Sequence, residues 1–200
     1  MRNGTPSANK HRVRREQLLG TLRPAELGRA LRSSDVRYVK NRRWIVGLSV
    51  FSTVVMGGIG LYQMGILRNM PEPPWPRFDA KKVNGSAQAY SILHTPDALL
   101  GAVSYSATAC LAGASDPDRA RTAPWIPLFM GAKLALDGAL AAKLTSDEWT
   151  KHRAFCFWCL LSTAATFVAA GLGAPEVIAA GREITSGEQI SGSLQGDRQR

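Results

Sequence analysis

Two cysteines three residues apart are the first residues in this sequence that could do chemistry. They are Cys156 and Cys159, in the stretch HRAFCFWCLLSTAATF at residues 152–167, where basic residues give way to an apolar run. A pair at this spacing can close a small disulfide loop, supply two ligands to a metal ion, or consist of two buried thiols on one helix turn. These possibilities require different surroundings, which depend on the nature of the apolar run.

Long apolar segments indicate a protein that spans a membrane. Residues 44–67 contain no charge over 24 positions, and as a helix they would extend about 36 Å, enough to cross a hydrocarbon core of about 30 Å. Three weaker apolar segments follow at 96–114, 123–142 and 154–174. The sequence therefore predicts an all-α integral membrane four-helix bundle, with two spans as the alternative.

Basic residues predict the orientation of the chain. Residues 1–43 carry 12 of the 25 lysine and arginine residues and only three acidic residues, so this arm should stay in the cytoplasm and rest on anionic headgroups. The segment at 44–180 is the predicted four-span membrane domain, and 181–200 is a predicted flexible cytoplasmic tail. Nucleic acid is the rival partner for so basic an arm. Because the arm has no nucleic-acid-binding motif, we expect the lipid bilayer instead and no nucleic acid.

This orientation places the cysteine pair near the outer face of the membrane. The richness in alanine, arginine and glycine hints at a bacterial source. The expected location is then the inner (plasma) membrane, with both termini cytoplasmic and the pair near the periplasmic face, where disulfide chemistry occurs. The first outer loop, 68–95, begins with a proline-rich stretch, and its part at 84–93 is compatible with a short interfacial helix.

The start of the second span has a clear helix signal. In HTPDALLG, Thr95 is suited to the N-cap, Pro96 to the first helical position and Asp97 to the first turn. Asp97 therefore has two interpretations, a favourable interaction with the helix dipole or a contact with a ligand. The sequence does not choose between them.

Two ionisable residues fall inside the third predicted span. Lys133 and Asp137 are four residues apart on one helix face, which predicts a mutually neutralising pair. A proton route or the polar end of a ligand pocket is the alternative. Cys110, in the second predicted span, is expected to be a packed thiol.

The surroundings of the cysteine pair favour redox chemistry over metal binding. His152 lies one turn before Cys156, but nothing supplies a fourth zinc ligand, so we expect no metal. The helix N-terminus together with Lys151 and Arg153 would stabilise Cys156 as a thiolate. A dithiol in a membrane needs a lipid-soluble electron carrier, for which a quinone is the obvious candidate. Two structural thiols remain the alternative.

Two motifs resemble the vitamin K epoxide reductase family. FCFWCLL resembles the Cys-x-x-Cys of that family, SILHTPDALLG resembles its loop-to-helix junction, and the order of the four spans also matches, over about 44–175. The resemblance implies a bundle around a quinone, either ubiquinone or menaquinone. It also implies that Cys159 is the thiol nearest the quinone, that Cys156 is the exchanging thiol, and that Asp97 lies where some members bind the quinone carbonyl.

The chain departs from the family pattern in its outer loop. Members usually carry a second cysteine pair there, whereas residues 68–95 contain none, and no fused thioredoxin-like domain is expected. The predicted function is a membrane thiol:quinone oxidoreductase, an enzyme that takes electrons from a separate thioredoxin-like or other thiol protein on the outer side. The alternative is a non-catalytic membrane interaction module of the same fold with structural cysteines. A small metal-binding membrane protein is the third possibility.

Overall fold

The computed structural model describes residues 28–29, 31–32, 37–90 and 94–197, and helices dominate this part of the chain. The four long helices are α3 (Arg37–Gln63), α5 (Asp97–Gly113), α7 (Trp125–Asp147) and α8 (Phe157–Asp197). Short helices connect them: α4 (Ala80–Asn84), the 3-10 helix η1 (Ala87–Tyr90), α6 (Arg119–Thr122) and the π-helical turn η2 (Glu148–His152). The prediction of an all-α protein is confirmed.

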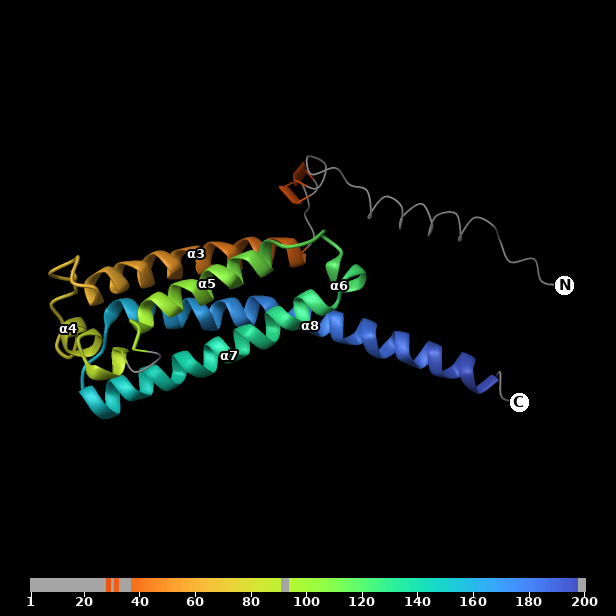
Figure 1. Cartoon of the computed structure of the whole chain (residues 1–200). Coiled ribbons are helices and arrows are strands. Elements are labelled where there is room, and N and C mark those ends of the chain that lie inside the picture. The colour runs from red at the N-terminus through yellow and green to blue at the C-terminus, as the bar shows by residue number, and fades with distance from the viewer. Residues whose placement is uncertain (1–27, 30, 33–36, 91–93, 198–200) are drawn as a thin grey trace.

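The long helices run back and forth along one axis (Figure 1). α3 packs against α5 and α8, and α7 packs against α8. The connections α4 and η2 lie at one end, here called the α4 end, and α6 lies at the other, the α6 end. α3 and α5 approach closely at Gly60, where a Cβ would lie 2.4 Å from Leu99 Cδ2 and the leucine side chain would have to shift.

Three helices of the described part are long and apolar enough to cross a membrane, namely those within Tyr38–Gln63, Trp125–His152 and Phe157–Ser186. Three of the four predicted spans correspond to them. α5 has 17 residues, about 26 Å as a helix, which is short of a hydrocarbon core of about 30 Å. The structure therefore supports a membrane protein with three candidate spanning helices, and it does not confirm the four-span bundle.

The predicted intramembrane pair is present. Lys133 Nζ lies 2.6 Å from Asp137 Oδ2 and also donates to Ser104 Oγ at 2.9 Å and to Thr108 Oγ1 at 2.8 Å. The two charges are thus neutralised between α5 and α7, as buried charges in an apolar medium require.

The prediction that Cys110 is packed is wrong, because its side chain is exposed. α5 buries Thr108 and Ala112, and Cys110 lies two residues from each, on the opposite face of the helix.

The loop and the tail differ in detail from the expectation. The short helix predicted within 84–93 is present as η1 (Ala87–Tyr90), α4 (Ala80–Asn84) is a second short helix before it, and residues 91–93 lie outside the described part. α5 begins at Asp97 with Pro96, not Thr95, as its N-cap. α8 continues as a helix to Asp197 through the segment predicted as a flexible tail. Most of the basic arm lies outside the described residues, and α3 takes up its last part from Arg37.

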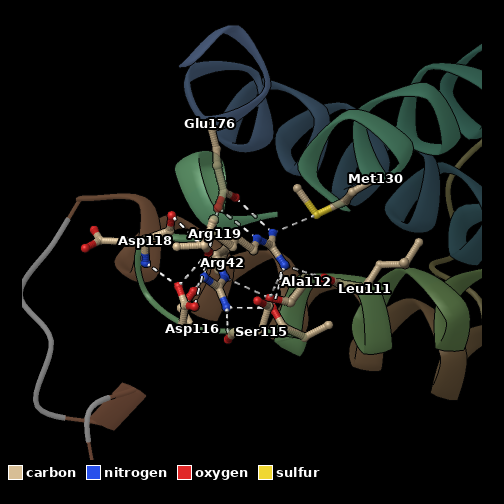
Figure 2. Close-up of polar contacts among 11 residues, drawn as sticks. Arg42, Leu111, Ala112, Ser115, Asp116, Asp118, Arg119, Met130 and Glu176 are labelled. Atoms are coloured by element: carbon tan, nitrogen blue, oxygen red, sulfur yellow. Dashed lines mark hydrogen bonds and ion pairs between the residues drawn. The ribbon is translucent and has the colours of Figure 1, made fainter. Parts of the chain in front are cut away.

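A buried cluster of charges joins the helices at the α6 end (Figure 2). Arg119, from α6, is fully buried and binds Glu176 of α8 with two nitrogens, at 2.8 and 2.9 Å. Arg42, from α3, lies with its Nη1 3.9 Å from the same carboxylate. One glutamate therefore holds two arginines that come from distant parts of the sequence.

The same two arginines satisfy the C-terminal carbonyl groups of α5. Arg119 Nη1 donates to the carbonyls of Leu111 at 2.6 Å and Ala114 at 2.9 Å, and Arg42 Nε donates to that of Ala112 at 2.9 Å. The last carbonyls of a helix lack partners within the helix and carry partial negative charge. The cluster thus closes the end of α5 while it joins α3, α6 and α8.

We expect Glu176→Gln to destabilise the protein by about 3 kcal/mol, because it leaves buried arginines without a counter-charge. Glu183→Gln is the matched control. Glu183 lies two turns further along α8 and pairs with Arg121 at 3.1 Å, but both side chains are exposed, so its loss should cost less than about 1 kcal/mol. Thermal unfolding in detergent micelles measures both, and equal effects would contradict the structural role of the cluster.

Candidate redox site

The cysteine pair lies at the α4 end, at the start of α8. Cys156 immediately precedes the helix, and its Sγ accepts a hydrogen bond from the backbone N–H of Cys159 at 3.3 Å. This is the position and the bond of an N-cap, with sulfur in place of the usual oxygen. Because a helix N-terminus favours negative charge, it stabilises Cys156 as a thiolate. Both cysteines are free thiols in the structure.

The first loop covers the pair. The segment before α4 is attached to the segment before α8 by two backbone hydrogen bonds, Phe155 N to the Arg77 carbonyl at 2.8 Å and Asp79 N to the Phe155 carbonyl at 3.0 Å. Ala80 and Val83 of α4 then belong to the same buried cluster as Cys156. Cys156 is fully buried and Cys159 is partly exposed, so the sulfur expected to exchange with an outer protein lies beneath α4.

Asn84, at the end of α4, contacts both thiols. Its Nδ2 donates to Cys156 Sγ at 3.3 Å, and its Oδ1 accepts from Cys159 Sγ at 3.7 Å. The side chain is buried. Sequence analysis missed this residue because an asparagine 72 positions before Cys156 carries no local signal of a contact with it.

Two glutamates accept the backbone N–H groups around the start of α8. Glu148 Oε2 accepts from Cys156 N at 3.1 Å, and Glu72 Oε1 accepts from Phe157 N at 3.3 Å. The other oxygen of Glu72 accepts from the N–H of Ala80, at the start of α4. The two carboxylates therefore hold the first loop, η2 and α8 together, and neither was predicted from the sequence.

The hydrogen bonds to Cys156 determine its acidity. The bond from the Cys159 thiol is the main cause that lowers the pKa of Cys156, burial opposes it, and the bond from Asn84 lowers it further. The cations expected to help are engaged elsewhere. Lys151 pairs with Asp147 at 3.0 Å, and the Arg153 guanidinium lies 5.7 Å from the centre of the Trp149 ring. The thiolate is thus favoured by hydrogen bonds rather than by the predicted nearby charges.

Asp97 also lies at the α4 end of the long helices. Its Oδ1 accepts from Gln63 Nε2 at 2.7 Å, and Gln63 Oε1 accepts from the backbone N–H of Ala98 at 3.4 Å. The carboxylate also lies within electrostatic range of Cys159. Asp97 is therefore both at a helix N-terminus and close to the pair, which leaves both interpretations of this residue open.

Two other features of the interior do not belong to the pair. No group of three or more His, Cys, Asp or Glu side chains in the described part of the chain is placed to hold a metal ion, and His152 does not form such a group with the two cysteines. A small cavity, with room for about one water molecule, lies deeper between the helices, where Ser52, Tyr105 and Asp137 are among its lining residues. Neither cysteine of the pair lines it.

Comparison with known proteins identifies the family. The model of the vitamin K epoxide reductase family matches residues 43–173, well over half of the chain. The chain belongs to the vitamin K epoxide reductase family. The matched range contains the cysteine pair, Asn84, Asp97 and both glutamates. No curated protein and no solved structure shows a significant match. Together with its apolar helices, membership of the vitamin K epoxide reductase family makes this chain a membrane protein of an oxidoreductase family.

We expect Asn84→Ala to raise the pKa of Cys156, because the substitution removes a donor to its sulfur. The thiolate then forms only at higher pH, so its fraction at neutral pH falls. The titration is followed by the ultraviolet absorbance of the thiolate in protein that carries Cys110→Ser and Cys159→Ser, with and without Asn84→Ala. An unchanged titration would show that the contact between Asn84 and Cys156 does not govern the acidity.

Proposed function

We propose that this protein is a membrane thiol:quinone oxidoreductase that passes electrons from a thiol protein through Cys156 and Cys159 to a lipid-soluble quinone, ubiquinone or menaquinone. The observation that carries the proposal is the arrangement of the pair. One sulfur lies at the N-cap of α8 with hydrogen bonds that favour its thiolate, and a partly exposed second thiol lies one turn further into the helix.

The two thiols have different roles in this proposal. Cys159, the more exposed and the deeper along α8, is the thiol nearest the quinone, and Cys156 completes the disulfide. The reduced pair gives up two electrons and two protons as the S–S bond forms, and the quinone takes up both to become the quinol. A reduced thiol partner then restores the pair by exchange through Cys156.

Polar side chains at the α4 end are suited to hold the quinone. Asn84 lies against both sulfurs and offers an amide that can donate to a carbonyl oxygen. Asp97 and Gln63 form a second polar group within electrostatic range of Cys159. In the proposal, the quinone ring lies beside Cys159 with one carbonyl oxygen toward this group.

The proposed arrangement in the membrane has four spans. α5 is one of them despite its length, because it carries no charge after Asp97 and exposes large apolar side chains such as Val103, 70% exposed. Large apolar groups on an outer surface suit contact with lipid. The basic arm supports cytoplasmic termini, and in the proposal the α4 end faces the periplasm across a bacterial plasma membrane.

The partner is expected to be a separate thioredoxin-like or other thiol protein on the outer side. The first outer loop, 68–95, has no cysteine, so electrons must reach the pair directly from that protein. Because Cys156 is buried beneath α4, the exchange requires the α4 segment to move away from the start of α8.

A non-catalytic membrane module of the same fold is the second candidate. Its support is that Cys156 is fully buried and packs with Val83, Ala98 and Ala154 in one apolar cluster, as a structural thiol would.

Replacing either cysteine of the pair with serine distinguishes the two candidates. We expect Cys156→Ser and Cys159→Ser each to lower dithiol-dependent quinol formation to the background rate, because a single thiol cannot deliver two electrons as an intramolecular disulfide. Cys110→Ser, at an exposed position outside the site, should retain full activity. Quinol formation is followed by absorbance with a soluble dithiol as reductant.

A second readout tests the redox state itself. In Cys110→Ser protein in native membranes, mass-tagging of free thiols should show that added quinone converts the reduced pair to a disulfide. If the pair stays free at every quinone concentration, the protein is the non-catalytic module.

A further inference from the structure

Glu148 accepts a backbone N–H at the start of α8, and it is also buried beside the thiol pair, which capping alone does not require. It belongs to η2, which follows α7, and it is 6% exposed. One carboxylate oxygen accepts the backbone N–H of Cys156 at 3.1 Å, and the same carboxylate interacts with the side chain of Cys159. Glu148 is thus a buried ionisable group that contacts the backbone of Cys156 and the side chain of Cys159.

The surroundings of Glu148 do not neutralise it. In the described part of the chain, no lysine or arginine forms an ion pair with this carboxylate. The charged groups that act on it from the neighbouring elements are acidic, namely Asp97 of α5 and Glu72 of the first loop. η2 also packs on α4, whose Asn84 is the polar group that faces the pair from that side.

The negative charge of Glu148 opposes a thiolate in the pair, although hydrogen bonds favour it. A thiolate beside a buried carboxylate places two negative charges in a region of low dielectric, where like charges repel strongly. Transfer of the thiol proton to Glu148 avoids this, since the site then holds one negative charge before and after the transfer. A carboxylate that binds the backbone N–H of Cys156 and interacts with the Cys159 thiol is in the position for such a transfer.

We propose that Glu148 is the proton carrier of the thiol pair. It takes one proton from a thiol as the thiolate forms, and it returns that proton to the reduced quinone as the disulfide closes. The S–S bond forms, both S–H bonds break, two electrons and two protons pass to the quinone, and Glu148 ends as the carboxylate it was at the start. This inference rests on the proposed function.

Glu148→Gln tests the role, and Glu72→Gln is its matched control. A glutamine at 148 keeps an oxygen that accepts from Cys156 N, so the cap on α8 is retained, but it cannot carry a proton. Glu72 caps the next N–H of the same helix at 3.3 Å. We expect Glu148→Gln to lower the turnover of quinone reduction by about 100-fold or more. It should also remove the decline of the rate at low pH that comes from protonation of Glu148. Glu72→Gln retains the proposed proton carrier, so its rate should fall far less than that of Glu148→Gln and the decline at low pH should persist.

In the same Glu148→Gln variant, the thiolate fraction of Cys156 should rise while the turnover falls. The negative charge of Glu148 raises the pKa of Cys156, so Glu148→Gln should lower that pKa and increase the thiolate fraction at neutral pH. Protein with Glu148→Gln and protein with native Glu148 are both titrated by thiolate absorbance in the Cys110→Ser, Cys159→Ser background. More thiolate together with slower turnover is the signature of a lost proton carrier.

The outcomes separate this inference from the function on which it rests. If the protein with native Glu148 does not reduce quinone, the proposed function fails. If it does, and Glu148→Gln matches Glu72→Gln in rate and pH profile, the two glutamates only cap α8 and the proton-carrier role is wrong.

Discussion

The backbone N–H groups at the start of α8 need hydrogen-bond acceptors at a place where apolar helices leave little water. The residues that provide these acceptors determine the rest of the site. An N–H group at a helix start has no partner within the helix and is costly to bury unpaired. Here the acceptors are the sulfur of Cys156 and the carboxylates of Glu148 and Glu72. The atom that caps the helix is therefore also the atom proposed to react, and the helix that needs the cap favours its charged form.

The α4 end and the α6 end satisfy the same rule with opposite charges. At the α4 end, carboxylates and a sulfur accept from the N–H groups at the start of α8. At the α6 end, Arg42 and Arg119 donate to the carbonyl groups at the end of α5, and Glu176 balances them. Each end joins elements that are distant in sequence through groups that a helix terminus requires. The positions of the long helices relative to one another are thus fixed by polar contacts at the ends as well as by apolar packing between them.

Local pattern was sufficient to predict much of the fold. The charge-free run at 44–67 predicted the first long helix, and the spacing of Lys133 and Asp137 predicted their ion pair, because both depend on residues close in sequence. The cysteine pair could also be placed at a helix start. Cys110 was misplaced because a run of small residues does not show which face of a helix meets its neighbours.

The partners of the pair could not be predicted in the same way. Asn84, Glu72 and Glu148 reach the cysteines only after the first loop folds over the start of α8, and no periodicity marks such a contact. Lys151 and Arg153 are adjacent to the pair in sequence but engage Asp147 and Trp149 instead. The prediction from sequence proximity therefore overestimated how far Lys151 and Arg153 stabilise the Cys156 thiolate. It also gave no sign of Asn84, whose amide contacts both sulfurs.

Glu72 connects the cover of the site to the helix beneath it. One of its oxygens accepts from Ala80 at the start of α4, and the other accepts from Phe157 at the start of α8. If α4 lifts, this carboxylate cannot remain on both helices, so one helix start loses its acceptor. Movement of α4 away from the thiols is consequently coupled to the loss of one Glu72 hydrogen bond, either at the start of α4 or at the start of α8. The N–H group left bare can then bond to water or to an acceptor on a protein that docks at this end, such as a backbone carbonyl.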